Sequence, residues 1–286
     1  MSMSAKAKLA GVIGWPVAQS LSPRLHGFWL EQHGIDGAYV PLPVRPENFS
    51  VALRGFRLAG FAGVSVTVPH KEAAFALADR CDAAAMAAGA VNQLVFHEDG
   101  SIEGLNTDAG GLEASLGENL GTSLNGKSMV LLGAGGAARA AVLALDALGA
   151  AEIRILNRHR DRADVLMAAL GANVKARLVP MGLGDWTKAA GNAALVVHTT
   201  SAGMKGSPPL DLALDVLPKD AAVCDIVYNP LETELLKRAR ARGLKIIDGL
   251  GMLMHQAVPA FRAFYGVTPK VTPELRRALE QALAHG

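Results

Sequence analysis

The chain has 286 residues, half of them hydrophobic, and a formal net charge of +2. The length suits two domains, and the nearly balanced charge argues against a nucleic-acid partner, which usually requires a clustered basic surface. No apolar run is long enough for a membrane span, and the first ten residues lack the apolar core of a secretory signal. Two cysteines, Cys81 and Cys224, are too few for a disulfide scaffold and indicate buried thiols in a reducing cytoplasm.

The first third of the chain alternates short apolar strands with helical stretches. Strands are predicted at 9–13, 38–44 and 63–68, and helices at 22–32, 49–59 and 71–78. Ser22 and Pro23 mark a helix start, because serine is a good N-cap and proline suits the first turn. Strand and helix in alternation predict a mostly parallel sheet with both faces covered.

A second strand–helix series follows a helical link. Its predicted strands are 128–132, 152–156, 195–198 and 223–227, with a further one at 245–248, and its first helix is 137–148. The chain from residue 253 onward is predicted to be helical, with a break around Pro269. The start of the second series places a domain boundary near Asp108.

The turn between the first strand and helix of this series carries a glycine-rich motif. Gly133-Ala134-Gly135-Gly136-Ala137-Ala138 fits the pattern G-x-G-x-x-[G/A]. The first glycine permits a tight turn, the second lets the backbone approach a pyrophosphate, and the helix N-terminus favours the phosphate charge. The motif predicts dinucleotide binding, and the alternative is a tight turn that binds nothing.

The end of the next predicted strand distinguishes the two nicotinamide dinucleotides. NAD-binding proteins place an acidic residue there to hold the ribose 2′-hydroxyl. This chain has Asn157 and Arg158, followed by Arg160 and Arg162. Arginine pairs with a 2′-phosphate, whereas an acid would repel it, so the sequence favours NADP over NAD. The alternative is a solvated basic helix start.

Several segments resemble, in order, the signatures of the shikimate dehydrogenase family. The first is Gly14-Trp15-Pro16-Val17-Ala18-Gln19-Ser20-Leu21-Ser22-Pro23, and the second is Val64-Ser65-Val66-Thr67-Val68-Pro69-His70-Lys71. Two shorter elements, Gly89-Ala90-Val91-Asn92 and Gly104-Leu105-Asn106-Thr107-Asp108, come next. Near the end, Asp225-Ile226-Val227-Tyr228-Asn229-Pro230 and the segment 248–257 also match. The resemblance runs from about residue 11 to about residue 266.

The resemblance implies a role for each matching residue. Lys71 would be the catalytic lysine, with Asp108 as its partner. The implied substrate ligands are Ser20, Ser22, Ser65, Thr67, Asn92, Tyr228 and Gln256. The implied cofactor contacts are Gly133, Ala134, Gly135, Gly136, Ala137, Asn157, Arg158, Arg162, Thr200, Ser201, Gly249 and Met252. Two serine hydroxyls at a helix start also make a neutral anion site by their chemistry, whereas Ser22 alone would be read as an N-cap.

By the same resemblance the fold is α/β with two domains and a cleft between them. A parallel α/β substrate-binding and catalytic domain would comprise residues 1–108 and 253–286, and a Rossmann NADP-binding domain residues 109–252. The implied activity is reversible NADP-dependent reduction of 3-dehydroshikimate to shikimate, in aromatic amino acid and chorismate biosynthesis, by a cytoplasmic protein with no metal. A monomer and a homodimer are both compatible with the sequence.

Five signature positions depart from the family pattern. Gln19 stands where histidine is usual, Ser65 where asparagine is usual, Gln93 where threonine is usual, His159 where threonine is usual, and His198 where asparagine is usual. Ser65 matters most, because serine is shorter than asparagine and lacks its amide donor and carbonyl acceptor. The departures leave open a divergent paralogue that acts on quinate or aminoshikimate.

The proton chemistry expected of Lys71 is also open. Oxidation of a secondary alcohol needs a hydride acceptor and a path for the hydroxyl proton. A lysine that acts as a base needs a lowered pKa, but a neighbouring carboxylate raises it. Lys71 therefore acts either as a base or as a group that positions the hydroxyl. A third alternative is a regulator that binds a dinucleotide without catalysis, although such a protein need not retain both Lys71 and Asp108.

Overall fold

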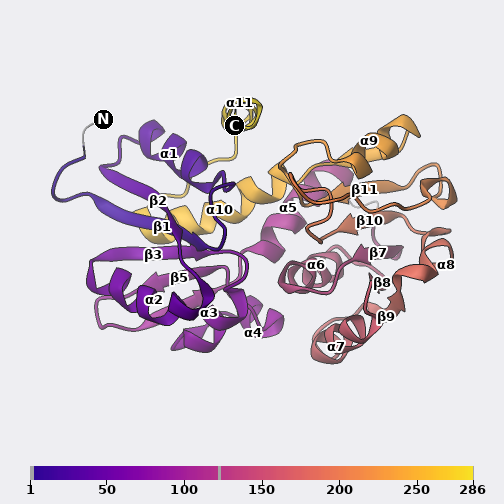
Figure 1. The fold of residues 1–286 in the computed structure, drawn as a ribbon, viewed down its shortest axis with the longest axis horizontal. Coiled ribbons are helices and arrows are strands. Elements are labelled where there is room, and N and C mark those ends of the chain that lie inside the picture. The colour runs from indigo at the N-terminus through magenta and orange to yellow at the C-terminus, as the bar shows by residue number, and fades with distance from the viewer. Residues whose placement is uncertain (1–2, 122–123, 286) are drawn as a thin grey trace. The chain divides into compact units, whose positions relative to one another are not determined.

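The structure, a computed structural model, describes residues 3–121 and 124–285 and contains two compact units. One unit is Met1–Thr107 together with Leu253–Gly286, and the other is Asp108–Met252 (Figure 1). Asp108, assigned above to the first domain, is the first residue of the second unit. Among the described residues, no helix has both the length and the apolar character needed to cross a bilayer.

A six-stranded sheet forms the centre of the first unit, in the order β2-β1-β3-β5-β6-β4. Its strands are β1 (Lys8–Gly14), β2 (Gly37–Pro43), β3 (Phe61–Val66), β4 (Arg80–Cys81), β5 (Gln93–Phe96) and β6 (Ile102–Leu105). The first three are parallel, as the sequence predicts, but β5 is antiparallel to both β3 and β6. A short turn, in which the Gly100 N–H donates to the His97 carbonyl at 3.0 Å, joins β5 to β6, and a turn of that length connects only antiparallel strands.

Helices cover both faces of this sheet. They are α1 (Ser22–Gln32), α2 (Phe49–Leu58), α3 (Lys71–Leu77), α4 (Ala83–Ala88), α10 (Leu250–Tyr265) and α11 (Pro273–Ala284). Residues of α2, α3 and α4 share one hydrophobic cluster with Val64, Val66 and Leu94 of the strands. On the opposite face Phe264 of α10 packs against β3 at Gly63, where a Cβ would lie 2.5 Å from the phenyl ring.

The second unit has a six-stranded sheet whose described pairings are all parallel, in the order β12-β11-β10-β7-β8-β9. Its strands are β7 (Ser128–Leu132), β8 (Glu152–Asn157), β9 (Arg177–Gly182), β10 (Leu195–His198), β11 (Ala222–Asp225) and β12 (Lys245–Ile247). The strand order reverses at β7, which lies between β8 and β10. In open α/β sheets, ligands bind outside the carboxyl ends of the strands at such a reversal.

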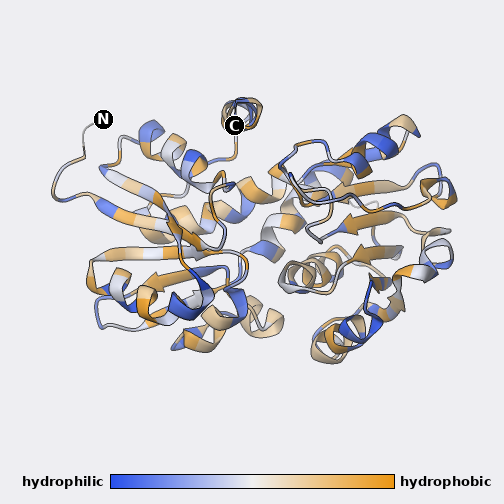
Figure 2. Ribbon diagram, in the orientation of Figure 1, coloured by the Kyte–Doolittle hydropathy of each residue, from blue (hydrophilic) through white to orange (hydrophobic). Residues whose placement is uncertain are grey.

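The parallel strands are apolar because helices bury both of their faces. Residues of α5 (Asp108–Leu120), α6 (Gly136–Ala147) and α7 (Arg160–Leu170) form one cluster with the sheet, and residues of α8 (Trp186–Ala190) and α9 (Glu234–Ala241) form another. Figure 2 shows apolar colour along the strands, whereas α9 is largely hydrophilic. This is the pattern of a sheet buried on both sides.

The cysteines lie in different units, and both are free thiols. Cys224 in β11 is buried, but Cys81 in β4 is only partly buried, so the expectation of two buried thiols is wrong for Cys81. The reason is that β4 has only two residues and lies at the end of the sheet order.

Candidate functional site

The predicted substrate residues of the first unit gather at the edge of its sheet where β1 and β3 end. Backbone hydrogen bonds join the segments there: the Thr67 N–H donates to Ile13 at 3.0 Å, and the Trp15 N–H donates to Val68 at 3.0 Å. The Val66 N–H donates to the Asn92 carbonyl at 2.7 Å. The residues after β1, after β3 and before β5 are therefore held together by main-chain bonds.

Asn92 is the centre of a buried polar cluster at this edge. Its Oδ1 accepts the Thr107 N–H at 2.8 Å, and its Nδ2 donates to Thr107 Oγ1 at 2.9 Å and to Gln256 Oε1 at 3.3 Å. The Thr107 hydroxyl donates to the Gln256 carbonyl at 2.8 Å. Two predicted ligands, Asn92 and Gln256, are thus brought together from segments 164 residues apart.

Thr107 is the member of this cluster that the sequence-based assignment missed. It is 8% exposed and holds both Asn92 and Gln256. The available signal was its place in the motif Asn106-Thr107-Asp108, of which only the aspartate was assigned a role. Its hydroxyl and N–H are both used within the protein, so its function at this edge is to orient the Asn92 amide and to anchor the main chain at Gln256.

Lys71 and Asp108 are connected to this cluster in different ways. The Lys71 carbonyl accepts the Val91 N–H at 2.9 Å, so the first residue of α3 is fixed to the residue next to Asn92. Asp108 is bonded in the chain to Thr107 and begins α5, where its negative charge suits a helix N-terminus. Lys71 is therefore anchored to Val91 by a main-chain bond, and Asp108 is anchored through its neighbour Thr107 to the Asn92 side chain.

His70 fixes the segment that leads to Lys71. It is 2% exposed, its Nε2 lies 2.8 Å from the Val44 carbonyl, and its ring stacks on Phe49 with centroids 4.5 Å apart. Val44 is itself bonded to the end of β1, because its N–H donates to the Gly14 carbonyl at 3.2 Å. The histidine thus holds the loop between β3 and α3 against its neighbouring segments.

Ser20 and Ser22 lie between β1 and α1. Ser22 is the first residue of α1 and the N-cap is Leu21, with no side-chain cap bond, so the interpretation of Ser22 as an N-cap is wrong. The helix begins one residue earlier than a serine cap would require, and Pro23 lies in its first turn. The Ser22 N–H donates to Ser20 Oγ at 3.3 Å, which keeps the two hydroxyl-bearing residues together.

Ser65 and Thr67 lie at the end of β3, and Ser65 pairs directly with Gln93 of β5. Opposed residues of an antiparallel pair point to the same face. Gly63, two residues before Ser65, faces Phe264, so Ser65 and Gln93 share the face covered by α10. The side chain of Gln93 is fully buried, and neither of its amide atoms has a partner among the described residues.

The predicted cofactor residues lie at the carboxyl ends of four parallel strands in the second unit. Gly133 follows β7, Arg158 follows β8, Thr199 follows β10, and Gly249 follows β12. Gly133 has φ +119°, and a Cβ there would lie 2.6 Å from Thr199 Oγ1, so only glycine fits this turn. Gly249 has a related constraint, since a Cβ would lie 2.1 Å from the Ile226 carbonyl oxygen.

The loop fits a dinucleotide by its geometry. Gly135 is exposed, and nothing lies within 4 Å of where its Cβ would be, so a pyrophosphate can approach the backbone at the N-terminus of α6. Ala134, Gly136 and Ala137 are partly buried around it. These are the features that phosphate binding at a helix start requires.

The basic segment after β8 is open to solvent. Arg158, Arg160 and Arg162 are all exposed, and Asn157 Nδ2 donates to the His159 carbonyl at 2.9 Å, which shapes the turn into α7. Arg160 forms an exposed ion pair with Asp164 at 3.8 Å. Arg158 and Arg162 are the other two exposed guanidinium groups of this segment.

The remaining predicted residues lie on neighbouring segments of the same unit. Thr200 is partly buried and bonded to His198, whereas Ser201 is exposed. Tyr228 is partly buried after β11, and Met252 is 9% exposed and packs in the hydrophobic cluster beneath α6. His198, which departs from the family pattern, is bonded to Asp225, a buried residue for which the sequence predicted no role.

The structure thus defines a class: a two-domain α/β protein with a polar cluster at one sheet edge and a Rossmann-type dinucleotide loop at another. Two family models match the chain: the shikimate dehydrogenase substrate binding domain over residues 12–94, and shikimate/quinate 5-dehydrogenase over residues 115–204. The shikimate dehydrogenase (NADP⁺) of Paramagnetospirillum magneticum is 53% identical over 279 residues, which is 96% of this chain and 98% of that protein.

Solved structures give the same result. The shikimate 5-dehydrogenase of Thermus thermophilus in complex with NADP(H) and shikimate has a TM-score of 0.83 at 36% identity, covering 97% of this chain and 99% of that one. The quinate dehydrogenase of Corynebacterium glutamicum in complex with NAD has a TM-score of 0.86 at 31% identity, covering 97% and 99%. The chain belongs to the shikimate dehydrogenase family, and the resemblance seen in its sequence is confirmed.

Proposed function

We propose that the protein catalyses the reversible NADP-dependent reduction of 3-dehydroshikimate to shikimate, in the biosynthesis of chorismate and the aromatic amino acids. The observation that carries this proposal is the polar cluster of Asn92, Thr107 and Gln256, in which Asn92 and Thr107 are buried and the residue before Asn92 is bonded to the Lys71 main chain. The name of the Paramagnetospirillum relative supports the same activity and cofactor. The free thiols of Cys81 and Cys224 are typical of a reducing compartment, so we propose a cytoplasmic location.

Substrate binding begins with its carboxylate. The hydroxyls of Ser20 and Ser22 and the N-terminus of α1 provide neutral donors for that anion, and the bond between Ser20 and Ser22 keeps them in place. The ring hydroxyls are held by the amides of Asn92 and Gln256 and by Thr67, with Ser65 and Tyr228 completing the set. Thr107 holds the Asn92 amide, and the Gln256 amide is held by Asn92 and by the Leu253 carbonyl, so both amides are fixed in orientation before the ligand arrives.

Lys71 and Asp108 manage the proton of the reacting hydroxyl. The Lys71 ammonium donates to the carbonyl oxygen of 3-dehydroshikimate and supplies the proton as the alcohol forms. In the reverse direction its amine receives the hydroxyl proton, and the Asp108 carboxylate stabilises the resulting ammonium. In this scheme both residues touch the same region of the substrate, and each is needed for turnover rather than for nucleotide binding.

The bound dinucleotide would supply the hydride in its reduced form, NADPH, and accept it in its oxidised form, NADP⁺. The residues of this chain that would hold it are those of the loop from Gly133 to Ala137, with Asn157, Arg158 and Arg162 at the phosphorylated ribose. Thr200, Ser201, Gly249 and Met252 would line the remaining length. Arg158 and Arg162 select the 2′-phosphate, because a guanidinium pairs with phosphate in a bidentate manner.

The experiment that tests the proposal is a substrate and nucleotide panel on the purified protein. Shikimate, quinate and aminoshikimate are each offered with NADP and with NAD, and formation of the reduced nicotinamide is followed by absorbance. We expect the largest kcat/KM for shikimate with NADP. Highest efficiency with quinate or aminoshikimate would instead identify a divergent paralogue. No absorbance change with any pair, in a protein that still binds NADPH, would identify a regulator.

A further inference from the structure

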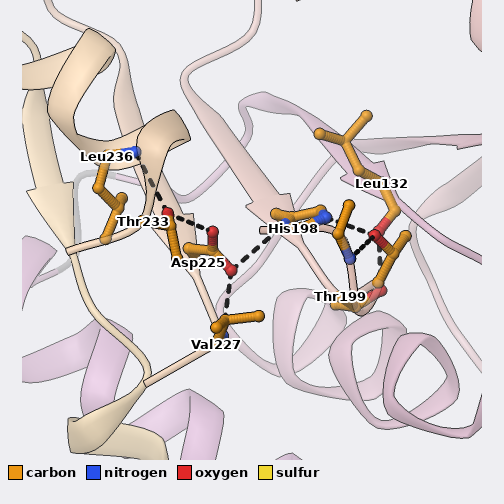
Figure 3. A network of polar contacts seen from close by, with 9 residues as sticks. Leu132, His198, Thr199, Asp225, Val227, Thr233 and Leu236 are labelled. Atoms are coloured by element: carbon orange, nitrogen blue, oxygen red, sulfur yellow. Dashed lines mark hydrogen bonds and ion pairs between the residues drawn. The ribbon is translucent and has the colours of Figure 1, made fainter. Parts of the chain in front are cut away.

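His198, at the end of β10, is the centre of a buried hydrogen-bond chain (Figure 3). Its side chain is 1% exposed; Nδ1 lies 3.0 Å from Asp225 Oδ1, and Nε2 lies 2.5 Å from Thr200 Oγ1. The imidazole thus connects the ends of two adjacent strands, because Asp225 is the last residue of β11. Thr200 belongs to the segment that follows β10, where the proposed cofactor contacts lie.

The hydrogen-bond directions in this chain are set by Asp225. Its carboxylate accepts the Thr233 hydroxyl at 2.7 Å and the Val227 N–H at 3.0 Å, and it accepts only, so His198 donates through Nδ1. In the neutral imidazole the second ring nitrogen is an acceptor, so Nε2 accepts a hydrogen bond from the Thr200 hydroxyl. The Thr200 oxygen in turn accepts the Ala202 N–H at 3.2 Å. The Thr200 hydroxyl is therefore used in hydrogen bonds within the protein.

The hydrogen bonds of Thr200 hold it and Thr199 against the glycine loop. The Thr199 hydroxyl donates to the Leu132 carbonyl at 2.8 Å, immediately before Gly133. A Cβ on Gly133 would lie 2.6 Å from Thr199 Oγ1 and 3.1 Å from Thr200 Cγ2. The two threonines thus form the surface on which the first glycine of the dinucleotide loop rests. Any shift of Thr200 is transmitted to that glycine by direct contact.

We propose that His198 is a positioning residue for the dinucleotide: with Asp225 it holds the Thr199–Thr200 segment in the arrangement that shapes the phosphate loop. This rests on the proposed cofactor site and adds to it a residue that touches neither substrate nor nucleotide. Asp225 extends the effect to the segment before Tyr228, through its bond to the Val227 N–H. Thr233, which also accepts the Leu236 N–H at 3.4 Å to cap α9, holds the Asp225 end of this series of hydrogen bonds.

The test measures NADPH binding to the purified full chain by equilibrium fluorescence, without any substrate. His198→Ala removes one donor from buried Asp225 and the partner of Thr200, and we expect the Kd for NADPH to rise about tenfold, in line with the loss of one buried hydrogen bond. His198→Asn keeps an amide donor and acceptor and should restore the Kd to within about threefold of the original. In turnover assays, KM for NADP should rise more than KM for shikimate.

A matched control separates positioning from stability. Glu152 begins β8 at the opposite edge of the same sheet, is 8% exposed, and is bonded to Arg154 and Arg177. Glu152→Gln disturbs a buried polar group of the same unit but should leave the Kd for NADPH unchanged. If His198→Ala does not fold, Thr200→Val removes the hydroxyl that His198 holds in a side chain of nearly equal size, and it should raise the Kd similarly.

Two results would overturn the inference. One is a Kd for NADPH that stays within about twofold of the original in both His198→Ala and Thr200→Val, well below the loss expected for a buried hydrogen bond. The other is an equal rise in Glu152→Gln. Either leaves the proposed function intact if the original chain binds NADPH and oxidises shikimate. Failure of the original chain to bind NADPH would overturn the cofactor site and the inference together.

Discussion

The protein should be less stable in mild acid, because His26 can bind a proton in the unfolded chain but not in the folded one. His26, on α1, is 1% exposed, and its ring stacks on Tyr39 with centroids 3.8 Å apart and meets the edge of Trp29 at 5.9 Å. Its Nδ1 has no hydrogen-bond partner among the described residues. Burial away from water lowers the pKa of His26 to about 3, from an ordinary value of 6.5.

The magnitude follows from this difference in pKa. Above pH 6.5 the ring is neutral in both the folded and the unfolded chain and makes no pH-dependent contribution. Below it, only the unfolded chain binds the proton, so the free energy of unfolding falls by about 1.4 kcal/mol per pH unit. The loss reaches about 2 kcal/mol at pH 5 and continues to grow until the pH approaches the folded-state pKa of about 3.

Urea unfolding at pH 7 and pH 5, followed by tryptophan fluorescence, measures this term. Trp29 reports on the region because it contacts His26. In His26→Phe, and in His26→Leu as a second variant, the loss of stability between the two pH values should be smaller by about 2 kcal/mol. The exposed His33 at the end of the same helix gives the control, since His33→Asn still contains His26. An equal loss in the original chain and in both His26 variants would refute the reasoning.

Three further outcomes are expected. Lys71→Ala should lower kcat by about 100-fold or more while the Kd for NADPH stays unchanged, and turnover near that of the original chain would refute the catalytic role. Arg158→Ala combined with Arg162→Ala should raise KM for NADP about tenfold or more and leave KM for NAD within about twofold, and a parallel rise in both would contradict selection by the 2′-phosphate. Gln93→Met should raise the free energy of unfolding by about 1–3 kcal/mol, because the buried amide of Gln93 has no partner among the described residues, and lower stability in urea unfolding would show that the amide is satisfied.

The regular elements of the fold could be predicted well from the sequence. The predicted helix 22–32 and strands 128–132 and 195–198 have the bounds of α1, β7 and β10 in the structure. These segments have clear signals: a proline in the first turn of α1, and apolar runs in strands that helices bury on both faces. The glycine-rich turn between β7 and α6 also had a clear signal, because the backbone at Gly133 adopts a conformation that only glycine fits.

What the sequence could not supply was the pairing of short strands and of polar side chains. β4, β5 and β6 have two to four residues each, too few for a periodic pattern to stand out. The contact of Asn92 with Gln256 spans 164 residues, and the bond of His198 to Asp225 depends on two strands being neighbours in the sheet. Such juxtapositions follow from topology, which the order of motifs along the chain does not reveal.

The reversed strand β5 explains why the polar cluster exists at all. Asn92 precedes β5 and Thr107 follows β6, only 15 residues apart in sequence, yet both lie at the edge where β3 ends. A parallel β5 would place Asn92 at the opposite edge, and a parallel connection needs a crossover of about a dozen residues or more. The tight turn between β5 and β6 instead returns the chain to its starting edge within the available length. The antiparallel hairpin is therefore the feature of the first sheet that brings Asn92 and Thr107 together, and with them the residue that begins α5.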